Sequence, residues 1–324
     1  MRHLALAFLL GILMLAGTGF AQQSGKPFIT IGTGGITGVY YAAGHAIAKV
    51  FRRNAKNPPF RLDAEASKGS VENINKVLAG DWAFGISQAD MLYKEEHGTG
   101  PWQGAPHDDL RAVAALYPEA VTLVTAADAE IRTIADLKGK TVSIGAPGSA
   151  DQGNVKQILA LHGIDPKTDL KLVELPPIDA SRELQQGFLD AYFYTVGHPN
   201  LSVREATFGS RKIRLIGIDP AITATAVQKI PYLIQTEIPI GFYPALENQS
   251  PVPTLGVKAV FFTSKETPDE TVTAVLQTLL DDFGRFQRQH PAFAGLTPKM
   301  LTQGVILPLH PAAERIYRKE GLLP

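Results

Sequence analysis

The chain has 324 residues, with 31 Lys and Arg balanced by 31 Asp and Glu, and it contains no cysteine. The even charge gives no support to nucleic-acid binding, and the lack of cysteine excludes disulfides and thiolate chemistry. This length, with 45% hydrophobic residues, is sufficient for two α/β lobes with conventional apolar cores.

The first 21 residues have the features of a secretory signal. Residues 1–3 form a short basic start, 4–16 are almost wholly apolar, and Gly19 and Ala21 supply small residues where a signal peptidase reads. The apolar run is too short to span a bilayer, so an uncleaved anchor is the less favoured alternative. We therefore expect cleavage after Ala21 and a soluble, periplasmic protein.

A strand, a polar turn and a helix are predicted three times in succession after the signal. The strands are expected at 28–32, up to about Ser67 and at 82–86, and the first two helices at 39–51 and 71–78. The apolar run 110–127 is longer than an ordinary strand and contains Pro118. We expect this run to cross between two lobes.

A second series of alternating elements follows. Strand, turn and helix are predicted over 139–163, a strand over 169–177, a helix and strand over 184–200, and a strand over 211–219. Such alternation favours parallel sheets with crossover helices. The apolar strand 252–266 is suited to return across the hinge, and closing helices are predicted at 271–290 and 312–319.

The predicted elements divide into two α/β lobes. We assign residues 22–124 with about 222–257 to lobe 1, and residues 125–221 with about 258–324 to lobe 2. Similar turns, 31–35 in one lobe and 144–149 in the other, each end a strand and open a helix. Binding crevices in open α/β sheets lie beyond the carboxyl ends of strands, and helix N-termini favour anions. An anion between the two lobes is therefore expected.

Other uses of the glycine turns fit the sequence poorly. A dinucleotide fingerprint beginning at Gly32 requires glycine at position 37, which is Thr37, and no Gly-Lys-Ser/Thr phosphate loop follows. Thr37 is interpreted as the N-cap of the next helix. The segment 85–89 lacks the final glycine of a nucleophile elbow, and no histidine pair has zinc-ligand spacing. We expect no enzyme activity, metal or cofactor, and only His198 is kept as a histidine lining the cleft.

Ordered blocks along almost the whole chain resemble the TAXI family, the extracytoplasmic solute receptors of one branch of tripartite ATP-independent periplasmic (TRAP) transporters. They include "ITIGTGGITGVYYAAGHAIAKVF", "SKGSVENIN", "GISQADMLY", "ADLKGKTVSIGAPGS", "DAYFYTVGHPN" and "LPLHPAAERIYRKEGL". The resemblance implies a two-lobed periplasmic-binding-protein fold, type II-like, with a ligand cleft at the hinge. It also implies a monomer that delivers a glutamate-like amino acid or a 2-oxoglutarate-type dicarboxylate to a TRAP-type permease.

The family's binding turns map onto this chain by motif. They point to Gly35, Thr37, Gly38, Tyr40, Ser67, Gly69, Ser70, Ser87, Gln88, Pro147, Gly148, Ser149, Tyr194, Thr195 and Gly197. Each has a structural alternative: glycines permit tight turns, and Ser149 with Gln152 fits a capping box. Tyr40 and Tyr41 are adjacent on a predicted helix, so at most one is expected to face the cleft.

Two departures from the family pattern bear on the ligand. Lys68 stands where a small neutral residue is usual, and Asp151 and Gln152 stand where a basic residue is common. We therefore add Lys68 as a candidate partner of a ligand carboxylate, while a surface lysine remains the alternative. A secreted enzyme or a ligand-sensing interaction protein on the same scaffold are the competing functions, because fold alone does not determine function.

Overall fold

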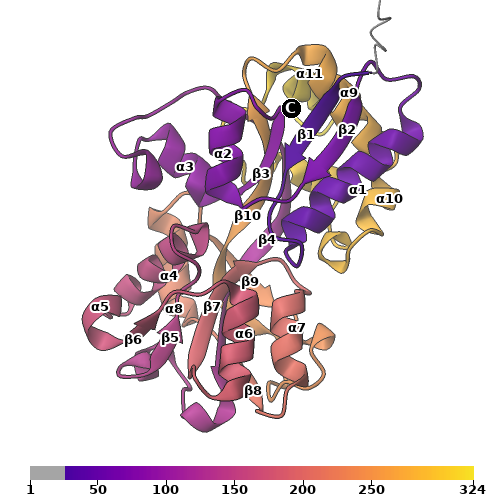
Figure 1. Ribbon diagram of the computed structural model, residues 1–324. Coiled ribbons are helices and arrows are strands. Elements are labelled where there is room, and N and C mark those ends of the chain that lie inside the picture. The colour runs from indigo at the N-terminus through magenta and orange to yellow at the C-terminus, as the bar shows by residue number, and fades with distance from the viewer. Residues whose placement is uncertain (1–25) are drawn as a thin grey trace, which may run out of the picture.

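The computed structural model describes residues 26–324, and the predicted signal segment 1–21 lies outside the described residues. Figure 1 shows two α/β lobes joined by the long strands β4 (Leu110–Ala126) and β10 (Val252–Ser264). Helices α1–α3 and α9–α11 surround one lobe, and α4–α8 surround the other. The predicted two-lobed α/β architecture is confirmed.

A ten-stranded sheet runs through both lobes, in the order β2-β1-β3-β10-β4-β7-β5-β6, with β8 paired to β4 and β9 to β10. The strands at the two ends are parallel to their neighbours, as predicted, whereas β10 and β4 are antiparallel to each other. The remaining strands are β1 (Phe28–Gly32), β2 (Arg61–Glu65), β3 (Phe84–Gln88), β5 (Thr141–Ser143), β6 (Lys171–Val173), β7 (Ala191–Val196), β8 (Ile213–Ile216) and β9 (Ile234–Ile238).

The helices follow the predicted series with some changes at their ends. The predicted closing helix 271–290 is divided in two, because the backbone leaves the helical conformation at Asp282. The helices are α1 (Val39–Asn54), α2 (Ser70–Leu78), α3 (Ala89–Glu96), α4 (Ala150–Leu161), α5 (Pro166–Asp169), α6 (Pro177–Gln186), α7 (Leu201–Phe208), α8 (Pro220–Lys229), α9 (Asp269–Asp281), α10 (Phe283–Gln287) and α11 (Pro311–Lys319). Within residues 26–324, none has both the length and the apolar character needed to cross a membrane.

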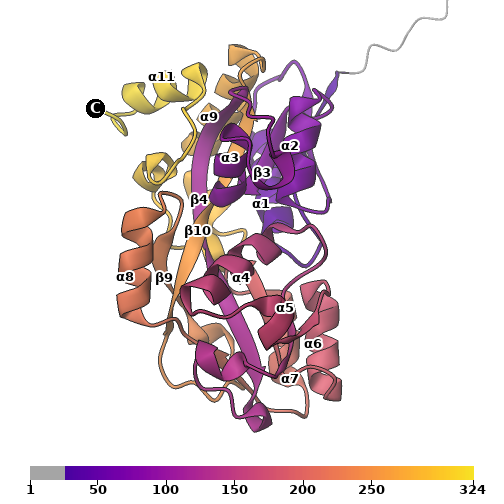
Figure 2. The ribbon, with the colours of Figure 1, turned by 90° about the vertical axis from the view of Figure 1, so that its left-hand side faces the viewer.

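The crossing strands β4 and β10 extend through both lobes, as Figure 2 shows. Their pairing runs from Gly256 opposite Ala120 to Ser264 opposite Leu110. Pro118, which cannot donate a ladder hydrogen bond, lies opposite Lys258 beside a register shift. The prediction that both apolar runs cross the hinge is confirmed.

The apolar cores correct the predicted division of the chain after residue 221. One core contains residues from Ala120 to Val257, and a second combines Ile31 to Tyr117 with Ala259 to Tyr317. The segment 222–257 therefore packs in lobe 2 and 258–324 in lobe 1, the reverse of the prediction. The reason is that β10 begins in lobe 2 and returns to lobe 1, so the chain changes lobes only after residue 257.

Helix α3 contains a buried acid without a partner within residues 26–324. Glu95 is buried, and neither of its carboxylate oxygens has a hydrogen-bond partner among the described residues. Burial, followed by the charges of Asp109 and Glu96, raises the pKa of Glu95 from 4.5 to about 7. The folded protein therefore favours the protonated carboxyl.

We predict that Glu95→Gln increases the free energy of unfolding above pH 7. Below pH 4.5, the substitution should have little effect on how the free energy of unfolding changes with pH. The pKa of Glu95 is higher in the folded than in the unfolded protein, so its ionisation reduces the free energy of unfolding as the pH rises between these two pKa values. The reduction is at most about 3 kcal/mol. Urea unfolding of both proteins at pH 4.5 and pH 8 measures this. A difference in unfolding free energy that stays constant with pH would contradict it.

Candidate functional site

A cavity of about 760 Å³ lies between the lobes. Its wall in lobe 1 comes from the turns after β1 and β2 and from the end of β3, and its wall in lobe 2 from the turns after β5 and β6 and from the end of β7. Fourteen of the predicted site residues line it: Gly35, Thr37, Gly38, Tyr40, Ser67, Lys68, Gly69, Ser70, Gln88, Pro147, Gly148, Ser149, Tyr194 and Thr195. The structure thus brings most of the predicted turns together, although their contact with a ligand stays a prediction.

Five helices begin at this cavity without a side-chain cap. The N-cap residues of α1, α2, α3, α4 and α6 all line the cavity, and none of their side chains accepts a hydrogen bond from the following turn. By contrast, α5, α7, α8 and α11 are capped by side chains at Asp165, Asn200, Asp219 and His310. Uncapped N-termini leave backbone N–H groups free for an anion.

The first turn differs from the prediction in one detail. Gly38, and not Thr37, is the N-cap of α1, and Gly38 N–H donates to Gly35 O over 2.8 Å. Thr37 instead contributes its carbonyl oxygen, which accepts from Asn200 Nδ2 of lobe 2 over 3.3 Å. Thr37 therefore joins the two lobes at the rim of the cavity.

The second turn is held by Ser67. Its Oγ accepts from Gly69 N–H over 2.9 Å and lies 2.7 Å from Asn73 Oδ1. Gly69 has φ of +96°, a conformation that favours glycine. Lys68 between them is exposed at the cavity, and its ammonium pairs with no carboxylate of residues 26–324. The Lys68 side chain is thus free to reach a ligand.

Of the two adjacent tyrosines, only Tyr40 lines the cavity, as predicted. Its hydroxyl donates to Glu119 Oε2 over 2.7 Å. Tyr41 packs edge-on against His45, with 4.2 Å between ring centroids. The helical rotation of about 100° per residue separates the two rings in this way.

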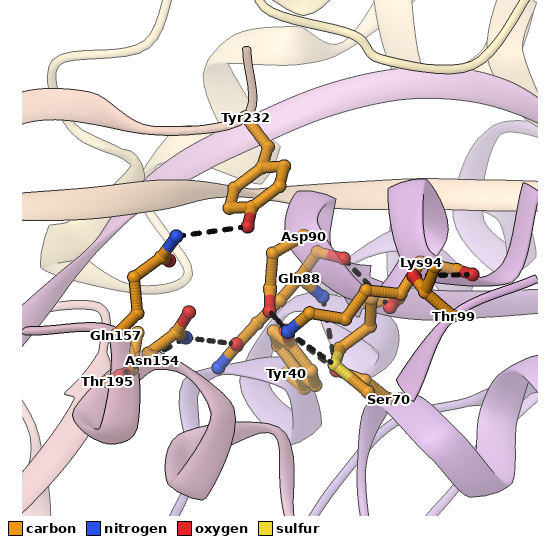
Figure 3. A network of polar contacts seen from close by, with 12 residues as sticks. Tyr40, Ser70, Gln88, Asp90, Lys94, Thr99, Asn154, Gln157, Thr195 and Tyr232 are labelled. Atoms are coloured by element: carbon orange, nitrogen blue, oxygen red, sulfur yellow. Dashed lines mark hydrogen bonds and ion pairs between the residues drawn. The ribbon is translucent and has the colours of Figure 1, made fainter. Parts of the chain in front are cut away.

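A polar network crosses the floor of the cavity (Figure 3). Gln88 of lobe 1 accepts a hydrogen bond from Asn154 Nδ2 of α4 over 2.7 Å, and the same nitrogen lies 3.4 Å from Thr195 Oγ1. Ser70 Oγ accepts from Gln88 N–H over 3.1 Å. Gln88 therefore connects Ser70 of lobe 1, through its backbone N–H, to Asn154 of lobe 2, through its side chain.

In lobe 2, the alternative interpretation of Ser149 is not supported. Ser149 is the N-cap of α4, but its Oγ is buried without a hydrogen-bond partner among the described residues. Gln152, the expected partner in a capping box, donates to Glu174 Oε1 over 2.6 Å instead. Ser149 Oγ is consequently an unsatisfied polar atom in the wall of the cavity.

Two buried carboxylates were missed by the sequence analysis as site residues. Glu119 on β4 and Asp151 on α4 line the cavity. Burial raises the pKa of Glu119 well above its ordinary value, and Asp151 and Asp90 raise it further against the lowering effect of Tyr40. Burial also raises the pKa of Asp151 to about 7. A lone acid in the apolar run 110–126 was the signal for Glu119.

Three predicted site residues do not line the cavity. Ser87 is buried and donates to Gln88 O over 3.0 Å, and Gly197 lies against the Tyr117 ring. His198 is buried between Thr122 Oγ1 at 2.9 Å and Tyr243 OH at 2.6 Å, and burial lowers its pKa to about 3. The polar partners of His198 come from distant strands and loops, which hold the ring inside lobe 2.

The fold and the cleft define a two-lobed binding-protein architecture, with a ligand-sized cavity at the hinge. Solved structures share the fold. A protein from Bordetella bronchiseptica RB50 is 16% identical, with TM-score 0.54 and coverage of 91% of this chain and 98% of that one. The binding protein component of an ABC phosphonate transporter from Pseudomonas aeruginosa is 10% identical, with TM-score 0.50 and coverage of 83% and 79%.

The family is established by sequence. The model of the NMT1-like family matches residues 31–321, so the chain belongs to the NMT1-like family. The matched region contains both lobes and every turn that lines the cavity.

We predict opposite results for two glycines of the predicted site. A Cβ at Gly197 would lie 2.6 Å from the Tyr117 ring, so Gly197→Ala should lower the free energy of unfolding by about 1–3 kcal/mol. A Cβ at Gly35 would meet nothing within 4 Å, so Gly35→Ala should change stability by no more than about 0.5 kcal/mol. Urea unfolding tests both, and equal losses would refute the assignment of Gly197 to packing.

Proposed function

We propose that this protein is a TAXI-type extracytoplasmic solute receptor. It captures a small organic ligand that carries a carboxylate, and it releases the ligand unchanged to a TRAP-type permease. The observation that carries the proposal is the convergence of five uncapped helix N-termini on one interlobe cavity. Free backbone N–H groups and the aligned helix dipoles stabilise negative charge at such a position.

The arrangement of the lobes supports capture by closure. The cavity walls belong to different lobes, while β4 and β10 form the connection between them. A ligand that contacts both walls stabilises the closed form by its additional contacts there. The TAXI subfamily, the export signal and the permease partner rest on the sequence blocks that resemble that family, and they are part of the proposal.

We predict that a ligand found in a library of small carboxylates compacts and stabilises the protein. A concentration 100 times the Kd should add about 2.7 kcal/mol to the free energy of unfolding. Thermal unfolding identifies the ligand, small-angle X-ray scattering measures compaction, and mass spectrometry of the recovered compound tests whether it is unchanged. Unaltered scattering at saturation would refute closure, and a converted compound would favour a secreted enzyme.

The proposal assigns Lys68 to a ligand carboxylate. Its side chain is exposed beside two uncapped helix N-termini, and a hydrogen bond to a charged group contributes about 1.5–3 kcal/mol. Lys68→Ala should therefore weaken binding about 10- to 100-fold. Calorimetry measures the effect with the ligand identified above.

Lys76→Ala is the matched comparison for Lys68. Lys76 also lines the cavity, but its ammonium already pairs with Asp81 Oδ2 at 2.7 Å. The loss of affinity should be much smaller, because Asp81 neutralises the positive charge of Lys76. Equal effects of the two substitutions would mean that Lys68 acts only through the overall positive charge of the cavity. If Lys68→Ala had no effect on affinity, Lys68 would be a surface lysine that does not contact the ligand.

A further inference from the structure

The carboxylates of Glu119 and Asp151 each have an oxygen at the cavity that accepts no hydrogen bond within the described residues. Glu119 is 3% exposed and Asp151 is 9% exposed, yet both line the cavity. Glu119 Oε2 accepts from Tyr40 OH over 2.7 Å, and Asp151 Oδ1 accepts from Thr195 N–H over 3.0 Å. Within residues 26–324, the second oxygen of each carboxylate accepts no hydrogen bond, although neither is sealed from solvent.

The charged groups around these carboxylates do not neutralise them. Asp90, whose charge raises the pKa of both carboxyls, is itself paired with Lys94 at 2.7 Å. The charge of Glu119 also raises the pKa values of three neighbouring tyrosines, Tyr40, Tyr117 and Tyr194, after the larger effect of burial. No basic side chain of the described residues forms an ion pair with Glu119 or Asp151.

Closure without a compensating charge would be costly for two such acids. A buried carboxylate is stable only when it is paired, hydrogen-bonded at its oxygens or protonated. The same cavity presents the positive ends of five helices, which suit a carboxylate of the ligand. The cavity therefore contains two regions of opposite electrostatic character.

We propose that the ligand is a zwitterion of the α-amino acid class. Its cationic nitrogen donates to the open oxygens of Glu119 and Asp151, while its carboxylate meets the uncapped helix N-termini. This inference rests on the proposed function, and it selects an amino acid over a dicarboxylate that has no cationic nitrogen.

The assignment predicts the direction of proton exchange on binding. The pKa of ligand-free Asp151 is raised to about 7 by burial, so part of the population is protonated at pH 7. A cationic nitrogen lowers the pKa of a neighbouring carboxyl, so binding of an amino acid should release protons. A ligand without such a nitrogen would require protonated Glu119 and Asp151 as donors, so its binding should take up protons.

Matched pairs of ligands test the class directly. Glutamate with 2-oxoglutarate, leucine with 4-methyl-2-oxopentanoate, and alanine with pyruvate each differ in having an amine or a keto group beside the same carboxylate. Calorimetry at pH 7 in two buffers of different ionisation enthalpy gives both the affinity and the proton exchange. We expect at least one amino acid to bind about 10-fold or more tighter than its 2-oxo acid, with proton release.

The isosteric variants Glu119→Gln and Asp151→Asn test the residues. Each should weaken binding of the amino acid about 10- to 100-fold and reduce the proton release, because a neutral amide no longer accepts as a charged group. Asp281→Asn, which removes one charge from α9, is the control and should bind normally. Thermal unfolding of the ligand-free variants verifies that they are folded.

The outcomes separate this inference from the proposed function. Tighter binding of a 2-oxo acid or dicarboxylate, or proton uptake on amino acid binding, would refute the zwitterionic ligand. Neither result would contradict the proposed receptor function. Undiminished amino acid binding by both variants would also overturn it. No binding of any carboxylate, with or without an amine, would refute the proposed function itself.

Discussion

The antiparallel pairing of β4 with β10 is the interaction on which the rest of the structure depends. Both strands are almost wholly buried, and their ladder continues the sheet from one lobe into the other. Gly256 permits this close approach, because a Cβ there would lie 2.5 Å from Glu119 O. The lobes are therefore connected by hydrogen-bonded backbone, and the same crossing places Glu119 at the floor of the cavity.

The cavity combines features that are unfavourable in a ligand-free protein. Helix termini without caps, the unsatisfied Ser149 Oγ and two carboxylates with open oxygens each lack a partner that a stable interior would supply. Some comparable groups in the rest of the described chain have partners, as with the ion pair of Asp90 Oδ2 and Lys94 or the cap at Asn200, whereas the Glu95 carboxylate has none. Unsatisfied groups concentrated in one cavity are the physical basis for proposing a ligand of mixed charge there.

Tyr40 and His198 show which site residues can be predicted from the neighbouring sequence and which cannot. The resemblance to the TAXI family places Tyr40 in the site through a motif at the glycine turn, and such a motif involves residues near in sequence. His198 also follows a strand end, but its ring bonds to Thr122 and Tyr243 in the interior of lobe 2. No sequence spacing distinguishes a histidine that faces a cleft from one that is satisfied within a core.

The sequence by itself determined the repeated strand, turn and helix units, the two lobes, the crossing strands and most of the turns that line the cavity. These features depend on periodicity and on glycine, serine and threonine at strand ends, which act over a few residues. Only the tertiary structure decided that 258–324 returns to lobe 1 and that Glu119 and Asp151 share a cavity with Tyr40 and Lys68. The reason is that strand pairing and burial join residues far apart in the chain, such as Tyr40 and Glu119, and such contacts have no local signature.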